Sequence, residues 1–285
     1  MFKIKITDNA GFCFGVERAI NLIEKVINKN REVYTIGPII HNPQEVERLE
    51  KKNVKVLTDI DKIKNCFLIL RTHGIPYLLY KKLRKNKSIN IIDATCPFVK
   101  KTQKIISRLG NSIKSKNEMI IIIGERSHPE IIALMSYNKS CSKCVVIESI
   151  VEAQNFNDKC CKLNVITQTT QTLENFENII KILKKRYKIK AYNTICKTTF
   201  ERQKSAKDLA KCVDLMIVIG GKNSSNTMKL FKACSLNTST YHIETEKELK
   251  KKWLLNVKKI GLTAGTSTPY WIIKRVEKKI KTLLN

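Results

Sequence analysis

Three cysteines in this chain each follow a strand-like segment and precede a helix-like one. Cys13 lies in Gly-Phe-Cys-Phe-Gly-Val, Cys96 in Asp-Ala-Thr-Cys-Pro-Phe, and Cys196 after the extended residues 190–195. Side chains in strand-to-helix turns lie at the carboxyl end of a parallel sheet, where such folds bind ligands. Because each third of the chain contributes one thiol, the pattern predicts three thiolates that converge on an iron–sulfur cluster.

Short apolar segments alternate with amphipathic ones along the chain, which is the pattern of an α/β fold with parallel sheets. A chain of 285 residues can form two or three domains. We therefore expect three similar small α/β lobes in a pseudo-threefold arrangement around a central iron–sulfur cluster cavity. The expected lobes are residues 1–96, 97–193 and 194–285.

The ten cysteines suggest metal binding or catalysis rather than disulfides, provided that the chain is intracellular. We expect a cytoplasmic protein that does not enter a membrane, because no apolar run reaches the roughly 18 residues of a membrane span and the N-terminus lacks a targeting pattern. Cys66 and Cys212 lie in or beside apolar segments and are expected to be small buried residues. Cys141 and Cys144 with Cys160 and Cys161 form an alternative zinc knuckle, although the second pair lacks the usual two-residue gap.

The net charge of +29 favours an anionic partner, either an acidic protein, an anionic substrate or a nucleic acid. The basic residues are spread along the chain, aromatic residues make up 7%, and no nucleic-acid recognition motif is visible. We therefore expect no nucleic-acid binding, and a basic nucleic-acid-binding protein stays as an alternative that a steep salt dependence of oligonucleotide affinity would support.

Three of the four histidines, His41, His73 and His128, lie in loops that follow predicted strands. A single histidine in such a loop is often a packed or solvated residue, but three in equivalent places favour a common role. His128 and Glu130, separated by one proline, could form a proton-delivery pair. The alternative for Glu130 is a stabilising charge in the first turn of a helix.

Two loops near the C-terminus, residues 220–226 and 264–269, combine glycine with hydroxyl and amide side chains. At the start of a helix, such loops bind phosphate through free backbone N–H groups and the helix dipole. Either loop alone could simply cap a helix. Two such loops favour an anion site, and a diphosphate would need further donors that His41 and His73 could supply.

Nine ordered motifs of this chain resemble those of the 4-hydroxy-3-methylbut-2-enyl diphosphate reductase family, the last enzymes of the methylerythritol phosphate route to isoprenoids. They are Gly11–Val16, Ile40–Asn42, Thr72–Gly74, Asp93–Pro97, His128–Glu130, Thr167–Thr170, Ile195–Cys196, Lys222–Asn226, and Thr263–Gly265 with Ser267.

The resemblance implies a monomeric, three-lobed enzyme with a 4Fe-4S cluster held by Cys13, Cys96 and Cys196. Three thiolates leave one of the four irons open to the substrate. Two electrons through the cluster would then remove the substrate hydroxyl as water, giving isopentenyl or dimethylallyl diphosphate.

By the same resemblance, Glu130 is the proton source, with His128 and Thr169 in the relay. The residues that would contact the substrate are His41, His73, His128, Thr169, Thr199, Ser224, Ser225, Asn226 and Ser267. The electron donor would be a ferredoxin or a flavodoxin.

Some positions depart from the family pattern. Lys197 directly follows the third cysteine, Phe200 and Glu201 precede Arg202, and Glu125–Arg126 stand where smaller residues are common. Two chemical alternatives also stay open. Three cysteines would fit a 3Fe-4S cluster, and a dehydratase with an open iron would remove water without a reductant.

Overall fold

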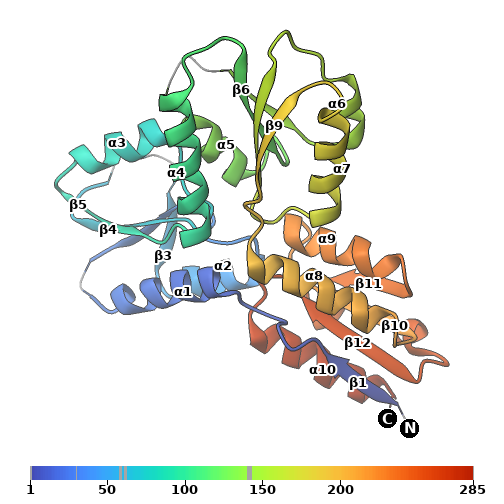
Figure 1. The fold of residues 1–285 in the computed structure, drawn as a ribbon. Coiled ribbons are helices and arrows are strands. Elements are labelled where there is room, and N and C mark those ends of the chain that lie inside the picture. Colours follow the sequence, from blue (N-terminus) through green and yellow to red (C-terminus); the bar gives the residue numbers. More distant parts are fainter. Residues whose placement is uncertain (1, 30, 58–59, 61–62, 140–142, 285) are drawn as a thin grey trace. The chain divides into compact units, whose positions relative to one another are not determined.

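The structure, a computed structural model, describes residues 2–29, 31–57, 60, 63–139 and 143–284 (Figure 1). The described strands form three four-stranded sheets, and every strand pairing described among them is parallel. The chain divides into two compact units. Unit 1 is Met1–Asn21, Pro38–Val54 and Lys197–Asn285, and unit 2 is Leu22–Gly37 and Lys55–Cys196.

The sheet of unit 1 has the order β1-β12-β10-β11. Its strands are β1 (Lys3–Ile6), β12 (Lys259–Ala264), β10 (Leu215–Ile219) and β11 (Ser239–Ile243). The alternating side chains of β10 enter two cores: Leu215, Ile217 and Ile219 pack against α10 (Tyr270–Leu284), and Met216 and Val218 pack against α8 (Lys197–Ala210) and α9 (Ser225–Ser235). Burial on both faces explains why β10 is uniformly apolar.

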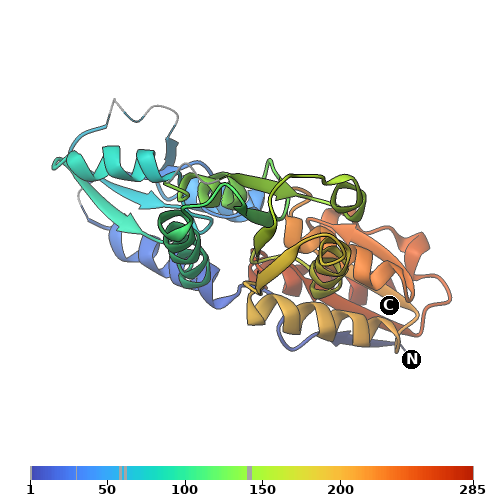
Figure 2. The ribbon, with the colours of Figure 1, turned by 45° about the horizontal axis from the view of Figure 1, so that its top comes forward.

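Strand β1 pairs with β12, from Lys3 opposite Lys259 to Ile6 opposite Leu262. The first strand of the chain therefore lies in the C-terminal sheet, and the start of β1 lies near the end of α10 (Figure 2). The expected lobe of residues 1–96 places this strand with the first sheet instead. A pairing between strands so far apart in sequence leaves no local sequence pattern, because it depends on how the distant strand packs and not on the residues next to β1 in the chain.

The first sheet of unit 2 has the order β3-β2-β4-β5, and its β3 begins at the unit boundary. The strands are β3 (Val54–Leu57), β2 (Val33–Ile36), β4 (Cys66–Leu70) and β5 (Ile89–Asp93). Leu83 of α3 (Tyr77–Lys85) packs with Leu68 and Leu70 in its core. Helix α1 (Phe14–Ile27) runs from unit 1 into unit 2, and α2 (Pro43–Glu50) belongs to unit 1.

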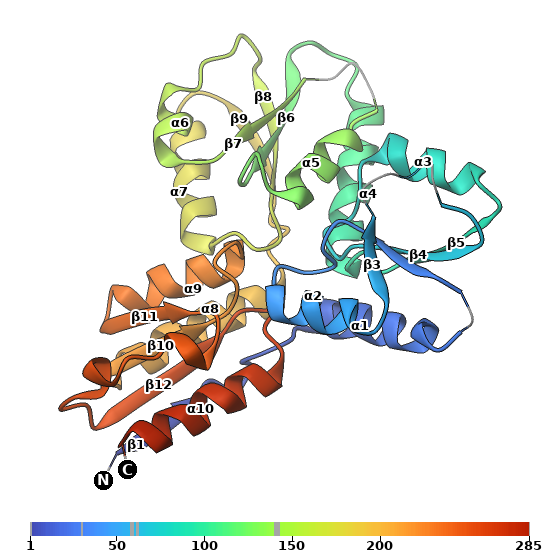
Figure 3. The ribbon, with the colours of Figure 1, turned by 180° about the vertical axis from the view of Figure 1, so that it is seen from behind.

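The second sheet of unit 2 has the order β7-β6-β8-β9 and helices on both faces (Figures 1 and 3). Its strands are β7 (Cys144–Ile147), β6 (Glu118–Ile123), β8 (Lys162–Thr167) and β9 (Lys188–Tyr192). Ile120 and Ile122 pack against α4 (Pro97–Ser112) and α5 (Pro129–Ser136), while Ile121 packs against α6 (Ile150–Asn155) and α7 (Leu173–Leu183). Two short 3-10 helices, η2 (Glu246–Glu248) and η3 (Lys251–Leu254), complete the described elements of unit 1.

None of the described helices is long and apolar enough to cross a membrane. The three sheets agree with the expected α/β class of parallel sheets and small lobes.

The cysteines outside the three turns divide into buried and exposed ones. Cys66 is fully buried in β4, as expected. The expectation for Cys212 is wrong, because this residue is exposed. Its N–H donates to the carbonyl of Leu209, so Cys212 lies in the turn after α8, and the chain enters β10 only at Leu215.

These differences predict which thiols react. Burial raises the pKa of the Cys144 and Cys234 thiols to about 12, so both stay protonated at pH 8. A protonated, buried thiol is a poor nucleophile. Brief treatment of the native protein with iodoacetamide at pH 8 should therefore modify the exposed Cys161 and Cys212 and spare Cys144 and Cys234. Peptide mass spectrometry checks this, and equal labelling of all four residues would contradict it.

Candidate active site

Each of the three cysteine turns places its thiol immediately before a helix. Helix α1 begins at Phe14, α4 at Pro97 and α8 at Lys197, one residue after Cys13, Cys96 and Cys196 respectively. A helix N-terminus carries partial positive charge and stabilises a thiolate. Neither α4 nor α8 has an acidic residue in its first turn to cancel this effect.

The backbone N–H of each cysteine is bound by another strand-end loop of the same unit. In unit 1, Cys13 donates to the Thr266 carbonyl at 3.1 Å. In unit 2, Cys96 donates to Thr72 and Cys196 to Thr169, both at 2.9 Å. The loops that the sequence marked as polar strand ends therefore hold the cysteines in place.

Glu130 lies in the first turn of α5, and both oxygens of its carboxylate accept hydrogen bonds from Thr169. Oε1 accepts the backbone N–H of Thr169 at 2.7 Å, and Oε2 accepts the Thr169 hydroxyl at 2.7 Å. Glu130 is 1% exposed and Thr169 is 5% exposed, so water competes little for these bonds. Such a two-point contact fixes the carboxylate and connects it to a hydroxyl through which a proton can pass.

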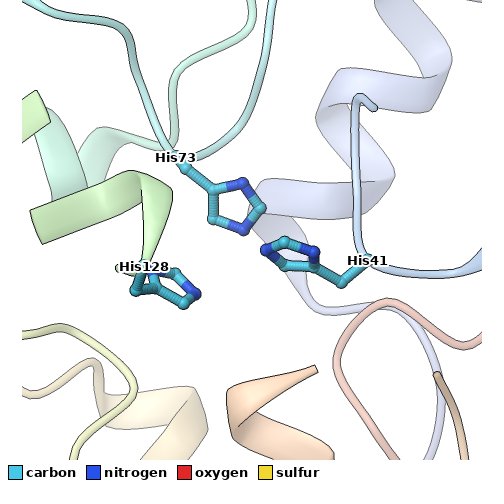
Figure 4. Close-up of side chains that lie close together, drawn as sticks. All are labelled: His41, His73 and His128. Carbon is cyan, nitrogen blue, oxygen red and sulfur yellow. The ribbon is translucent and has the colours of Figure 1, made fainter. Parts of the chain in front are cut away.

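His128 caps the start of α5, and its Nδ1 accepts the backbone N–H of Glu130 at 3.1 Å. In a neutral imidazole the other nitrogen then carries the hydrogen, so Nε2 is a donor. The ring of His73 meets the ring of His128 edge to face, with centroids 5.2 Å apart (Figure 4). The structure therefore brings two of the three predicted loop histidines together within unit 2.

These contacts form a continuous path across unit 2. The Cys96 N–H donates to the carbonyl of Thr72, the residue before His73. The His73 ring contacts the His128 ring, and His128 Nδ1 accepts the N–H of Glu130. Thr169 completes the path, because it binds both the Glu130 carboxylate and the backbone of Cys196. Two of the predicted cluster cysteines, through their backbone N–H groups, and the predicted acid–base group thus belong to one connected arrangement.

In unit 1, the loop after β10 caps the start of α9. The Ser224 hydroxyl accepts the Thr227 N–H at 3.3 Å, and Lys229 donates to the Ser225 hydroxyl at 2.8 Å. Asn226 is 3% exposed, and neither polar atom of its side chain has a hydrogen-bond partner among the described residues. A buried amide without partners is costly, which suggests that a ligand satisfies it.

The two predicted phosphate loops and the His41 loop meet within unit 1. Ser267 donates its hydroxyl to the His41 carbonyl at 3.2 Å. A Cβ atom at Gly221 would lie 2.5 Å from that same carbonyl oxygen, so only glycine permits this approach. His41 is also labelled in Figure 4. Thr199, in the first turn of α8, is buried with 2% exposure.

Sequence reasoning missed two polar residues of unit 1. Asn42 caps α2 through Oδ1, while its buried Nδ2 has no partner among the described residues. The Thr227 hydroxyl is likewise buried without a partner in this part of the chain. Asn42 directly follows the candidate His41 within the motif Ile40–Asn42, so its position in the sequence was a signal for it. Thr227 carried no signal beyond its place at a helix start.

The residues that depart from the family pattern are exposed, except for Glu125, which is half-buried. Lys197 and Glu201 form an exposed pair at 3.5 Å, and Phe200 is 42% exposed. Arg126 pairs with Glu152 at 2.7 Å.

The alternative zinc knuckle gains no support. Cys144 belongs to β7, where burial holds its pKa far above that of a zinc-binding thiol, and burial also raises the pKa of Cys160. Cys161 is exposed, and Cys141 lies outside the described residues.

Parallel α/β sheets whose strand ends carry thiols, histidines and a carboxylate held by a threonine define an enzyme rather than a nucleic-acid-binding or scaffolding protein. The chain belongs to the LytB protein family, whose model matches residues 4–281.

Curated relatives cover almost the whole chain. A 4-hydroxy-3-methylbut-2-enyl diphosphate reductase from Campylobacter hominis is 45% identical over 99% of this chain and 99% of its own length. The same enzyme from Geobacter sulfurreducens is 42% identical over 99% of this chain and 98% of its own length.

Solved structures show the same fold. One, described as (E)-4-hydroxy-3-methyl-but-2-enyl diphosphate reductase, the terminal enzyme of the non-mevalonate pathway, has a TM-score of 0.70 and 40% identity, covering 99% of this chain and all of that chain. The E-1-hydroxy-2-methyl-but-2-enyl-4-diphosphate reductase from Plasmodium falciparum has a TM-score of 0.87 and 28% identity, covering all of this chain and 88% of that chain.

Proposed function

We propose that the chain reduces 4-hydroxy-3-methylbut-2-enyl diphosphate to isopentenyl and dimethylallyl diphosphate, the last step of the methylerythritol phosphate pathway. The reaction consumes two electrons and two protons, breaks the carbon–oxygen bond of the terminal hydroxyl and releases one water. The observation that carries the proposal is the series of contacts in unit 2 that links the backbone of Cys96 and Cys196 to the buried carboxylate of Glu130. The full-length likeness to reductases supports the substrate.

The described cysteines fit an iron–sulfur group with three protein ligands. Cys13, Cys96 and Cys196 are partly exposed, and each lies at a helix start that stabilises a thiolate. Of the other described cysteines, Cys66, Cys160 and Cys234 are buried, and burial raises the pKa of the Cys144 and Cys234 thiols to about 12. When bound, a 4Fe-4S cluster on these three residues supplies electrons one at a time and an open iron for the substrate.

In this proposal, unit 2 handles the protons. A protonated Glu130 passes its proton to the Thr169 hydroxyl, whose own proton moves on to the leaving hydroxyl of the substrate. The His128 Nε2–H, oriented by the bond at Nδ1, donates a hydrogen bond to the substrate. His73 supports the His128 ring from its edge.

Unit 1 is proposed to hold the diphosphate. The start of α9 offers the positive end of the helix dipole and the Ser224, Ser225 and Asn226 side chains. The Asn226 amide supplies a buried donor that lacks a protein partner. Ser267, whose hydroxyl donates to the His41 carbonyl, and the His41 ring supply further polar contacts. Thr199, buried in the first turn of α8, is a further proposed substrate contact.

Asn226→Leu tests this assignment through two effects of opposite sign. The wild-type amide is buried without a partner, so leucine should raise the free energy of unfolding by about 1 kcal/mol. The same change should raise KM for the substrate roughly tenfold or more. Thermal unfolding with and without inorganic pyrophosphate checks both effects, since pyrophosphate should stabilise the wild type and leave the variant unchanged. A variant that is destabilised yet still responds to pyrophosphate would contradict the assignment.

Anaerobic turnover by protein reconstituted with iron and sulfide tests the reaction. With dithionite as reductant, we expect both isoprenoid diphosphates, and without reductant we expect none. A dehydratase would instead release water without a reductant and leave a diene diphosphate in place of the two isoprenoid diphosphates, so formation of that diene would reject the reductase. No product from protein that carries a full cluster would reject the proposed function.

The remaining parts of the proposal concern partners and state. We propose a ferredoxin or a flavodoxin as the electron donor and a monomer as the active form, located in the cytoplasm. The net charge of +29 supports an acidic donor.

A further inference from the structure

Helix α4, which begins directly after Cys96, has a basic solvent face. Before the exposed last residues Asn111 and Ser112, its exposed residues are Pro97, Phe98, Lys101, Lys104 and Arg108. These positions repeat every three or four residues and therefore lie along one side of the helix. We call these five residues the α4 stripe, which starts with an apolar pair next to the thiol and continues with three positive charges.

The charges of the α4 stripe are not neutralised within the described part of unit 2. Helix α4 contains no acidic residue, and its ion pair, Lys100 with Asp93 at 2.7 Å, lies off the stripe. The ion pairs among the described residues do not involve Lys101, Lys104 or Arg108. Like charges at this spacing repel one another along a helix. An acidic partner would therefore reduce the electrostatic repulsion among these three side chains.

The segment that contains the α4 stripe has a larger excess of basic over acidic residues than the chain as a whole. The whole chain has 25 acidic residues against 54 basic ones, whereas residues 75–117 contain a single acidic residue, Asp93. A cavity of about 280 Å³ beside the helix adds Lys139 to the basic lining. The basic residues of the segment are Lys81, Lys82, Arg84, Lys85, Lys87, Lys100, Lys101, Lys104, Arg108, Lys114 and Lys116.

We propose that the α4 stripe is the docking surface for a small acidic one-electron carrier of the ferredoxin type, with Cys96 as the point of electron entry. The inference rests on the proposed reductase function. Complementary charge steers and orients the carrier, while Phe98, 38% exposed, supplies the apolar contact next to the thiol. Two reduced carriers dock in turn, and each loses one electron, which balances the two electrons of the reaction.

The test measures binding separately from catalysis. Isothermal titration calorimetry of the holoenzyme with an acidic plant-type 2Fe-2S ferredoxin gives Kd at low and high salt. The variant is Lys101→Glu with Lys104→Glu, and the matched control is Lys278→Glu with Lys279→Glu, an exposed pair on α10 that makes the same change in net charge. A third variant, Phe98→Ala, removes the apolar contact without changing charge.

The α4 variant should bind ferredoxin at least about tenfold more weakly and lose most of the salt dependence, whereas the α10 control should lose less than about threefold. Phe98→Ala should weaken binding at both salt concentrations. Turnover driven by dithionite, which needs no docking surface, should stay at the wild-type rate in all variants.

Equal affinities of the α4 and α10 variants would overturn the docking proposal, even with dithionite turnover intact. Binding of a single-stranded oligonucleotide to the α4 stripe as tightly as ferredoxin would also overturn it. Absence of dithionite turnover in the wild type would instead reject the reductase function.

Discussion

Glu130→Gln is expected to lower kcat by about 10²- to 10⁴-fold while the fold stays intact. Glutamine keeps the size of the side chain, and its amide can still meet both groups of Thr169. Its carbonyl can accept the backbone N–H, and its NH2 can donate to the hydroxyl, which then turns its own hydrogen elsewhere. No orphaned polar group results, so the effect on rate is separable from stability. What glutamine cannot do is carry and release a proton.

Three measurements make this prediction specific. Turnover with dithionite gives kcat, thermal unfolding gives stability, and iron content shows that the cluster is loaded. Glu152→Gln is the matched control, because that carboxylate is paired with the surface residue Arg126 and should leave the rate unchanged. Thr169→Val, which keeps the backbone N–H but removes the hydroxyl, should also slow turnover. If Glu130→Gln retained a tenth or more of the wild-type rate with a full cluster, Glu130 would not be the proton source.

Strands buried on both faces were the elements that sequence predicted best. The apolar run 215–219 is β10 without any change of bounds. Strand β11, at the edge of its sheet, carries a weaker apolar signal because it includes Ser239 and Thr240, although His242 lies in a strand pattern. The helical pattern that begins at Leu173 continues in the sequence to about Tyr187, but α7 ends at Leu183, and Tyr187 instead packs in the core, where its hydroxyl accepts the Asp158 N–H at 2.9 Å.

The candidate site was predictable as a set of loops but not as a set of contacts. Glycine, hydroxyl and histidine residues after strands mark the loops, because the carboxyl ends of parallel strands bind ligands. That Thr169 would hold both oxygens of Glu130, and that Cys196 would bond to the same threonine, depends on pairings between β8, α5 and α8. Such pairings arise only when the chain packs, and so a single sequence does not carry them.

Cys196→Ser is expected to remove all measurable turnover, while Cys212→Ser should keep the wild-type rate. Both residues adjoin α8, Cys196 directly before its start and Cys212 after its end, so the two substitutions test position and not thiol chemistry. A serine hydroxyl at the helix start stays protonated at neutral pH and is a poor ligand for iron in place of a thiolate.

Iron and sulfide content after anaerobic reconstitution, with the visible absorbance of the cluster, provides a readout besides activity. The Cys196→Ser protein should bind less iron and lose its absorbance on gel filtration, while its far-ultraviolet circular dichroism matches that of the wild type. The Cys212→Ser protein should be loaded like the wild type. Equal loading of both variants would exclude Cys196 as a ligand. It would also contradict the cofactor assignment, which depends on three cysteines that each directly precede a helix.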